Sequence, residues 1–293
     1  MILRGRLQTL LLSPLAILLL ATVVIPAVIL LSYSLYVWYA LQPEGGLTLA
    51  NFQTALTGRL YSQVAYTTLA VAGPATLLSV VGGYVLAYYA VFVQKHGRAL
   101  MFALIVSAVM ASYLARIFAW RTLLGDTGLL NSWLIGLGII HQPLTFLLYS
   151  RPSAIFAMTA LYMPLAALTF YAALSGISAD YREAARDLGA GGLQALRRIT
   201  LPLSGPALLT TTALIFFLAC GDYFTPILVG GVDTLTVGRL ISDDFGTIGD
   251  YGMGATLSFF MLTAFVAAYL LLRTLMRWTG LLPETIGNTG VQS

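Results

Sequence analysis

A polar loop between two long apolar segments is the most informative part of this sequence: residues 178–202 read SADYREAARDLGAGGLQALRRITLP. Asp180 suits the N-cap of a short helix, and Glu183 follows three residues later, as in a capping box. We therefore predict a helix over residues 181–188. Gly189 comes directly after it, where helices commonly end on a left-handed residue that glycine adopts without strain.

A second helical piece is predicted over residues 193–200, and Pro202 suits the first turn of the helix that follows it. The loop thus contains two short helices that meet at an angle. Its positive charge comes from Arg182, Arg186, Arg197 and Arg198. We expect this loop to be held against a membrane, because the segments on both sides of it are long and apolar.

The composition of the whole chain indicates a membrane protein. Of its 293 residues, 59% are hydrophobic and 9% are charged, against roughly 25% charged residues in an average soluble domain. The 16 tyrosines and 4 tryptophans suit a protein with two lipid–water interfaces. The formal net charge is +4, but the basic residues stand singly between apolar runs, which argues against nucleic acid as a partner.

Six apolar segments are long enough to cross a bilayer, because about 20 helical residues span a hydrocarbon layer of roughly 30 Å. The predicted spans are residues 11–39, 66–93, 99–123, 152–174, 202–226 and 253–278. They form one transmembrane domain over residues 11–279, which contains the polar loop at 178–201. A polar tail follows at 280–293. The weaker apolar stretch at 129–140 is too short and too rich in glycine to cross.

The distribution of positive charge predicts the orientation of the spans. Six spans put the N-terminal tail at residues 1–10, the loop at 178–201 and the C-terminal tail on one side. That side holds most of the 15 Lys and Arg residues, which is typical of the cytoplasmic side of a membrane protein. Both termini are therefore predicted to be cytoplasmic.

The polar loop resembles the EAA loop in the permease subunits of ATP-binding cassette (ABC) importers. The family's spacing is matched by Glu183, Ala184, Ala185, Gly189, Ile199, Leu201 and Pro202. The resemblance implies an all-α integral membrane protein with the six-helix, MetI-like fold of type I importer permeases, in a bacterial inner membrane.

The same resemblance implies that the short helix docks into a groove on an ATP-binding subunit and transmits its movement to the pore. The residues expected to couple to that subunit are Asp180, Glu183, Ala184, Ala185, Arg186, Leu188 and Gly189. The alternative is an amphipathic helix that lies on the bilayer surface.

An ATPase site of the chain's own is excluded by its lysine content. A phosphate-binding loop needs a lysine directly after a glycine. The only lysine, Lys95, lies between Gln94 and His96. We therefore expect a transport subunit rather than an enzyme, without a cofactor of its own; ATP and Mg²⁺ would bind to the partner ATPase. His96 and His141 are isolated in the sequence, so no metal site is predicted.

Two further segments resemble the first permease of spermidine/putrescine-type importers: residues 221–231 read GDYFTPILVGG and residues 116–120 read RIFAW. This resemblance implies transport of a small cationic solute, such as spermidine or putrescine. It also implies three partners: an ATP-binding subunit that acts as a dimer, a second homologous permease, and an extracytoplasmic solute-binding protein. Related permeases carry opine-like compounds, other small amines or phosphonates, so these substrates remain alternatives.

Two ionised residues, Arg116 and Asp222, lie inside predicted spans at similar depths. An ionised group in a bilayer needs a partner or a wet cavity. One interpretation is a mutual ion pair. The other is that Asp222, with Tyr223, Trp120 and Tyr113, lines the outer part of the translocation path, where a carboxylate and aromatic faces would attract an amine.

Residues 233–250 form an acidic outer loop that could concentrate a cationic solute, contact a basic face of the binding protein, or simply connect two spans in water. An ion-coupled secondary transporter is the alternative from a different functional class. It would need several carboxylates buried near the membrane midplane, and in this sequence only Asp222 qualifies. No arrangement of nucleophile, acid and base that would suit a membrane enzyme is present.

Overall fold

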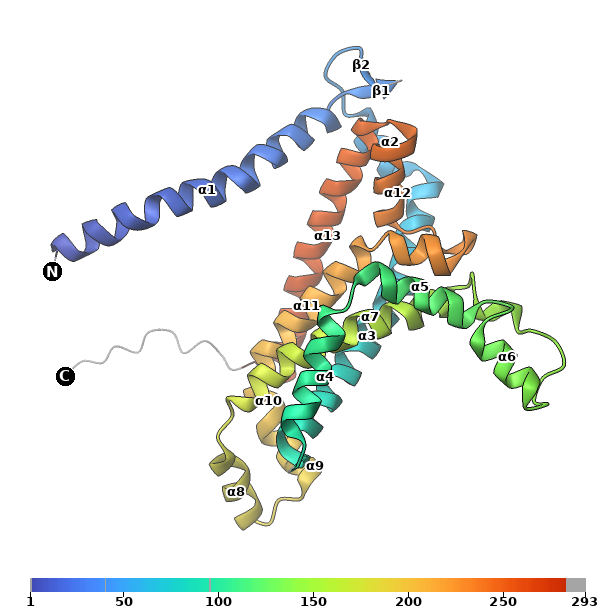
Figure 1. Ribbon diagram of the computed structural model, residues 1–293. Helices are drawn as coiled ribbons and strands as arrows, with labels where there is room; N and C mark the ends of the chain where they lie inside the picture. The colour runs from blue at the N-terminus through green and yellow to red at the C-terminus, as the bar shows by residue number, and fades with distance from the viewer. Residues whose placement is uncertain (1, 40, 95, 283–293) are drawn as a thin grey trace. The chain divides into compact units, whose positions relative to one another are not determined.

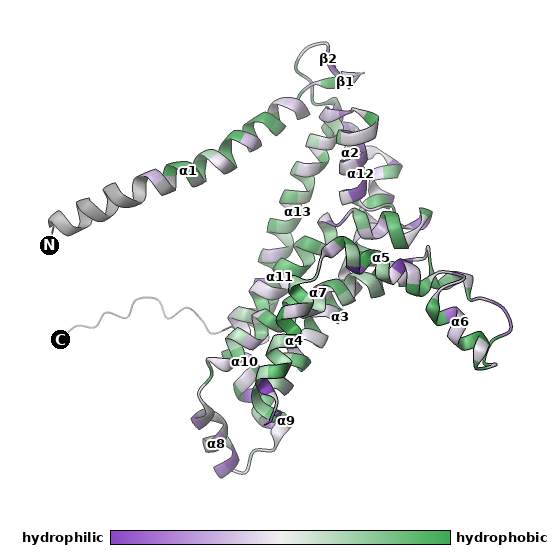
Figure 2. Ribbon diagram, in the orientation of Figure 1, coloured by the Kyte–Doolittle hydropathy of each residue, from purple (hydrophilic) through white to green (hydrophobic). Residues whose placement is uncertain are grey.

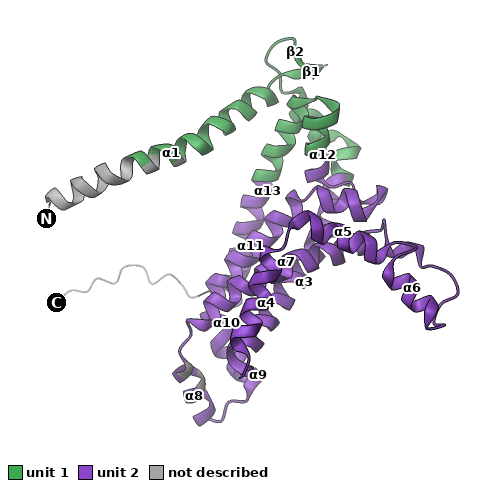
Figure 3. Cartoon of the chain, in the orientation of Figure 1, with its two compact units in different colours: residues 1–63, 240–262 green, residues 64–239, 263–293 purple. Residues whose placement is uncertain are grey.

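The chain is described by a computed structural model over residues 2–39, 41–94 and 96–282, and within these ranges it is helical apart from one β-hairpin and the connecting loops (Figure 1). It divides into two compact units, residues 1–63 with 240–262 and residues 64–239 with 263–293 (Figure 3). Helices α3, α12 and α13 each contribute residues to both units. The prediction of an all-α membrane protein is confirmed.

The first unit holds the N-terminal helix and the elements that follow it. Its elements are α1 (Ile2–Ser34), β1 (Val37–Tyr39), β2 (Gln42–Glu44), α2 (Ala50–Thr57), the start of α3 (Arg59–Tyr88), most of α12 (Val237–Asp243), η6 (Asp244–Ile248) and the first half of α13 (Tyr251–Trp278). The two strands pair in antiparallel fashion.

The first apolar helix ends earlier than predicted. Its span was expected to continue to residue 39, but α1 ends at Ser34 and the chain turns into the hairpin. The buried amide of Asn51 donates to the carbonyl oxygens of Ser34 at 3.0 Å and Tyr36 at 2.8 Å. These hydrogen bonds satisfy carbonyl groups at the end of α1 that have no partner within the helix. The side-chain amide of Asn51 therefore stabilises the end of α1 at this position.

The second unit contains the remaining helices. Beyond its parts of α3, α12 and α13 they are η1 (Tyr89–Val93), α4 (Arg98–Met110), α5 (Tyr113–Leu124), α6 (Leu129–Gly136), η2 (Thr145–Leu147), α7 (Arg151–Ser175), α8 (Ala179–Asp187), α9 (Gly192–Ala195), η3 (Leu196–Thr200), α10 (Leu201–Leu203), α11 (Gly205–Gly221), η4 (Pro226–Gly230) and η5 (Val232–Thr234). Helix α7 packs against α4, α5, α11 and η4 and is the centre of this unit.

Close packing between α3 and α7 depends on two adjacent glycines. A Cβ atom on Gly83 would lie 2.7 Å from the Cβ of Ala166, and one on Gly82 would lie 2.6 Å from the sulfur of Met163. Phe170 is fully buried beside this contact. These two glycines therefore let the two helices approach closely, as small residues commonly do in membrane proteins.

The helices found at the six predicted spans differ in length and in whether they are straight or bent. Within the described residues, three helices are long and apolar enough to cross a membrane by themselves: Arg59–Val93, Arg151–Ser175 and Tyr251–Trp278. Two more candidates are bent pairs, Arg98–Met110 with Tyr113–Gly136 and Gly192–Leu203 with Gly205–Gly221. Helix α1 adds the shorter apolar stretch Leu20–Ser34.

The third predicted span, residues 99–123, is not one continuous helix. It breaks at Ala111, which has an extended backbone, and at Ser112, which is also non-helical, and the axis turns by 92°. Neither proline nor glycine explains the break. Tyr113 and Arg116 follow it directly and form hydrogen bonds to α7 and to the end of α11, so contacts with other helices set the direction of α5.

The fifth predicted span also begins later than expected. Pro202 lies in the short helix α10 instead of the first turn of the span, and α11 starts at Gly205 after a bend of 72°. Pro206 takes the position in the first turn that had been expected for Pro202. Both prolines suit helix starts, and the sequence did not distinguish between them.

Candidate functional site

Helix α8 forms the polar tip of the loop between α7 and α11, and it stands out as hydrophilic beside the apolar helices of the same unit (Figure 2). Its N-cap is Ser178, not Asp180 as predicted. The Ser178 hydroxyl accepts a hydrogen bond from the N–H of Asp180 at 3.3 Å. Asp180 therefore lies in the first turn, where its negative charge interacts favourably with the positive end of the helix dipole. The predicted capping box with Glu183 does not form, since the cap lies two residues earlier.

The end of α8 agrees with the prediction. Gly189 has a φ of +80°, in the left-handed region. Its N–H donates to the carbonyl of Arg186 at 2.8 Å, and the N–H of Ala190 donates to the carbonyl of Ala185 at 2.9 Å. This pair of bonds closes the helix as expected for a C-terminal glycine.

The side chains of α8 that were predicted to contact a partner are mostly exposed. Leu188 is 89% exposed, the adjacent turn also presents Glu183 and Ala184, and Ala185 alone of this set is buried. Asp180 and Arg186 are exposed as well. A capped helix that presents an apolar side chain among charges is suited to insertion into a groove of another protein.

The loop joins the bundle at an elbow between α10 and α11. The hydroxyl groups of Ser204 and Tyr84 form a buried hydrogen bond of 2.9 Å, which ties the elbow to α3. The Tyr84 ring packs edge to face on Phe170 of α7, with centroids 5.1 Å apart. Gly205 has no room for a side chain, because a Cβ would clash with the carbonyl oxygen of Leu281. Three elements of the bundle therefore hold the point where the loop enters α11.

A second polar cluster surrounds Asp222 at the end of α11. The carboxylate is 5% exposed and accepts hydrogen bonds from the hydroxyls of Tyr113 at 2.6 Å, Tyr162 at 2.9 Å and Thr225 at 2.6 Å. It also accepts from the backbone N–H of Thr225 at 3.0 Å. Asp222 thus caps the helical turn that follows α11 and links it to α5 and α7.

The ion pair between Arg116 and Asp222 is not found in the described part of the chain. Arg116 instead donates through Nη1 to the carbonyl of Leu161 at 3.0 Å. The carboxylate of Asp222 accepts its side-chain hydrogen bonds from hydroxyl groups, as described above. The Nε atom of Arg116 is buried without a hydrogen bond. The two charges are compensated separately, by dipoles rather than by each other.

The remaining residues of the predicted path differ in their contacts with this cluster. Tyr113 contacts Asp222 directly, and its ring also approaches Phe224, with centroids 6.4 Å apart. Tyr223 packs on Phe224 at 4.2 Å. Trp120 is half-buried on α5. The structure therefore joins Asp222 with Tyr113. Tyr223 follows Asp222 in the sequence, and Trp120 lies on the same helix as Tyr113.

Sequence reasoning missed Tyr162, which donates to Asp222 from α7. A signal was present, because a tyrosine hydroxyl inside an apolar span needs a hydrogen-bond partner. The sequence could not identify that partner, since 60 positions separate the two residues.

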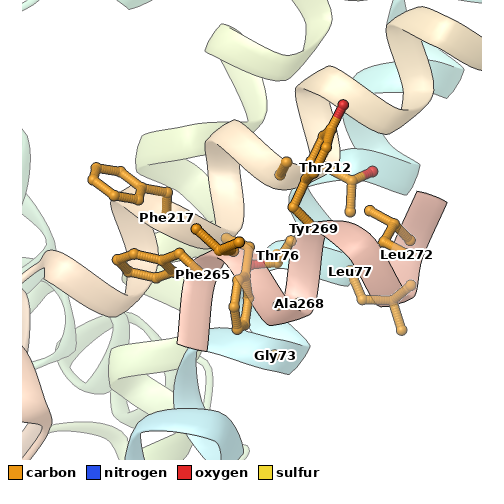
Figure 4. A pocket seen from close by; sticks show the side chains of 12 residues that line it. Gly73, Thr76, Leu77, Thr212, Phe217, Phe265, Ala268, Tyr269 and Leu272 are labelled. Atoms are coloured by element: carbon orange, nitrogen blue, oxygen red, sulfur yellow. The ribbon is translucent and has the colours of Figure 1, made fainter. Parts of the chain in front are cut away.

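An apolar groove of about 490 Å³ lies between α3, α11 and the second half of α13 (Figure 4). Phe217 and Phe265 pack against each other along it, with ring centroids 4.4 Å apart, and Tyr269 and Leu77 also line it. No carboxylate is among its lining residues. The groove therefore does not suit a cationic solute, which would lose its hydration there without gaining a counter-charge.

The acidic outer loop is not uniformly solvated. Asp244 in the first unit is 4% exposed, and its Oδ2 atom makes no hydrogen bond in the described structure. Burial, with further contributions from Asp250 and Asp243, raises the pKa of Asp244 to about 7. The loop thus includes one carboxyl group that is partly protonated at neutral pH, so its negative charge is smaller than the sequence indicates.

Asp244 is expected to make the stability of the first unit depend on pH. Its pKa rises from roughly 4 when unfolded to about 7 when folded, so the folded state binds the proton more tightly. Asp244 therefore does not destabilise the folded state below about pH 4, and it destabilises this state increasingly as the pH rises from there to about 7. Asp244→Asn should raise the unfolding temperature of the purified protein at pH 8 and have a smaller effect at pH 5. Asp126→Asn, on an exposed loop, is the control; equal profiles for both variants would refute the assignment.

No metal site is found within the residues that the structure describes, because no group of three or more His, Cys, Asp or Glu side chains is arranged to hold an ion.

The family model described as binding-protein-dependent transport system inner membrane component matches residues 79–280. The chain belongs to this family. Its members are permease subunits of ABC importers, multi-pass proteins of the inner membrane whose ATPase is a separate subunit. This assignment confirms the resemblance found in the polar loop, and it excludes the ion-coupled transporter and the membrane enzyme.

Curated relatives include the spermidine/putrescine transport system permease protein PotB of Haemophilus influenzae, 31% identical over 72% of this chain and 73% of that protein. PotB of Escherichia coli is 31% identical over 72% of this chain and 76% of its own length. A solved ABC importer of the acidic polysaccharide alginate has the same fold, with a TM-score of 0.76 at 20% identity over 94% of this chain and 96% of that one. The predicted MetI-like permease fold is confirmed.

Proposed function

We propose that this permease forms half of the translocation pathway for a small cationic solute, a polyamine such as spermidine or putrescine. ATP hydrolysis in the separate ATPase subunit would drive the transport. The observation that carries the mechanism is the geometry of α8, a short capped helix that ends on left-handed Gly189 and presents an 89% exposed Leu188. Such a helix is suited to receive movement from a partner and to pass it on as a rigid body.

The proposed route from α8 into the bundle runs through the elbow. Helices α9 and α10 connect α8 to Ser204, where the hydrogen bond to Tyr84 and the contact of Gly205 with Leu281 hold three elements together. A displacement of α8 would therefore act on α3 and α11 at once. Because α11 ends at Asp222, the same displacement would reach the far end of the bundle.

The proposed assembly contains an ATP-binding subunit acting as a dimer, a second homologous permease and an extracytoplasmic solute-binding protein. ATP and Mg²⁺ would be bound by the ATPase, and this chain would need no cofactor. The transmembrane domain would cover residues 11–279, with α8 and both termini on the cytoplasmic side. The positive charge of the loop at 178–201 supports this orientation.

The names of the relatives support a polyamine as the solute. PotB proteins from two organisms share 31% identity with most of this chain. A second candidate solute is 2-aminoethylphosphonate, because its putative transport system permease PhnU of Salmonella typhimurium is 28% identical over 76% of this chain. Both solutes carry an ammonium group, and they differ in the presence of a phosphonate.

The substrate can be tested by the ATPase activity of the complete complex in lipid nanodiscs. Binding protein loaded with spermidine or putrescine is expected to stimulate ATP hydrolysis, and binding protein offered 2-aminoethylphosphonate is not. Empty binding protein is the control. Stimulation by the phosphonate alone would refute the polyamine assignment while leaving the ATP-driven mechanism intact. A complex that hydrolyses ATP without any response to a loaded binding protein would contradict the mechanism itself.

A further inference from the structure

A polar cleft of about 420 Å³ lies in the second unit where α5 ends and α7 begins. Its walls include Phe118, Arg121, Thr122, Gly125, Thr127 and Tyr149. Helix α7 runs from Arg151 beside this cleft to Ser175, which leads into α8. The cleft and the proposed ATPase contact therefore lie at opposite ends of α7.

Local contacts build the loop around this cleft into a fixed shape. The fully buried Asn131 donates to the carbonyl of Gly125 at 3.0 Å and accepts from the N–H of Leu144 at 2.8 Å. Gly128 admits no side chain, because a Cβ would lie 2.5 Å from the carbonyl oxygen of Thr122. A buried amide that holds two distant parts of one loop favours a single loop conformation.

Tyr149 is held in an unfavourable backbone conformation at the edge of the cleft. Its φ is +56°, which is uncommon for a residue with a side chain. Its N–H donates to the carbonyl of Val229 at 2.8 Å, and its own carbonyl lies against Gly231. Strain of this kind persists where surrounding contacts fix it, and it is concentrated at binding sites.

Arg121 is the only charged residue among those lining the cleft. It is exposed and makes no hydrogen bond or ion pair within the described structure. Arg151 at the same end of α7 differs, because its Nε donates to the carbonyl of Asp233 at 3.0 Å. The cleft thus offers a guanidinium group, beside threonine and tyrosine side chains, to a ligand from outside.

This chemistry selects an anionic group. A guanidinium presents paired N–H donors that match a carboxylate in bidentate fashion, whereas it repels a polyamine. The polar lining also differs from the apolar groove between α3, α11 and α13, which could accommodate hydrocarbon. A carboxylate of a water-soluble protein therefore fits the cleft better than a lipid.

We propose that the cleft receives an aspartate or glutamate side chain of the solute-binding protein, with Arg121 as its counter-charge. The inference rests on the proposed function, because it requires a binding protein that docks opposite the ATPase end of α7. Docking there would place the partner where α5 ends and α7 begins, and both of these helices pack against η4.

The test measures the affinity of solute-loaded binding protein for the complete complex in nanodiscs of zwitterionic lipid, at low and at moderate salt. Arg121→Gln is expected to raise Kd about 10-fold and to weaken its dependence on salt, as for the loss of one charge-assisted contact. Arg121→Glu should raise Kd further, because it replaces attraction by repulsion. Arg59→Gln, which removes an exposed arginine outside the cleft, should retain the wild-type Kd.

Equal Kd values for the wild type, Arg121→Gln and Arg121→Glu would overturn the proposal. An effect of Arg121→Gln that appears only in nanodiscs with anionic lipid would also overturn it and assign the cleft to a lipid phosphate. A wild-type complex whose ATPase ignores the loaded binding protein would refute the proposed function, so that failure is recognised separately.

Discussion

Replacing Gly189 with proline is expected to reduce solute uptake about 100-fold. The residue has a φ of +80°, and its N–H donates to the carbonyl of Arg186 at 2.8 Å. Proline fixes φ near −65° and has no N–H, so it disfavours this helix end by about 3 kcal/mol or more, a factor of about 100 in population. Uptake of labelled spermidine by cells and co-purification of the ATPase subunit would both be measured.

Gly191→Pro provides a matched control two residues further along the loop. Gly191 already has a φ of −66°, and nothing lies within 4 Å of its Cβ position. The φ of this residue suits proline, so uptake should stay close to the wild-type level. Equal uptake by the two proline variants would refute the coupling role of α8. Loss of uptake by the Gly189 variant with the ATPase still bound would place the defect in transmission rather than in assembly.

The sequence predicted α8 well because the signals there are local. A helix of a few turns needs a cap, a run of helix formers and a glycine at its end, and all of these lie within residues 178–189. The exact cap was wrong, since Ser178 and Asp180 are both good N-cap residues. The φ of Gly189 was predictable because few other residues adopt the left-handed conformation without strain.

The shape of the bundle was less predictable, because distant residues set it. The break after Met110 has no glycine or proline, and the hydrogen bonds of Tyr113 and Arg116 to other helices explain the direction of α5. The elbow at Ser204 depends on Tyr84, which is 120 positions away. Hydropathy gives the length of apolar segments, but it does not say which polar side chains meet inside the membrane.

The candidate path shows the same limit. The sequence identified Asp222 as a carboxylate that needed compensation, and this was sound because an isolated charge in a bilayer is costly. One of the two interpretations paired it with Arg116, on the basis of charge and depth. In the structure, the hydroxyl groups of Tyr113, Tyr162 and Thr225 compensate the carboxylate instead. A hydropathy profile does not show which hydroxyl groups bind a carboxylate.

Asp222→Ala is the variant expected to damage the folded protein most. It would leave the hydroxyls of Tyr113, Tyr162 and Thr225 and one backbone N–H without their acceptor. Each buried donor that finds no new partner destabilises the fold by about 1–3 kcal/mol. We therefore expect a loss of several kcal/mol, measured as a lower unfolding temperature in detergent and a lower yield of folded protein.

Asp222→Asn and Tyr162→Phe separate this structural role from solute binding. The asparagine keeps one acceptor oxygen, and Tyr162→Phe removes one donor, so each should destabilise the protein less than Asp222→Ala. If the cluster only holds helices together, the effects of Tyr162→Phe and Asp222→Ala on stability will not be additive, because the two residues share one hydrogen bond. The KM for spermidine of the remaining folded protein will then be unchanged. If Asp222 binds the solute instead, Asp222→Asn will raise that KM while the unfolding temperature stays the same. We expect non-additive effects on stability and an unchanged KM, since a cation could reach this carboxylate only by displacing hydroxyl groups that already surround it.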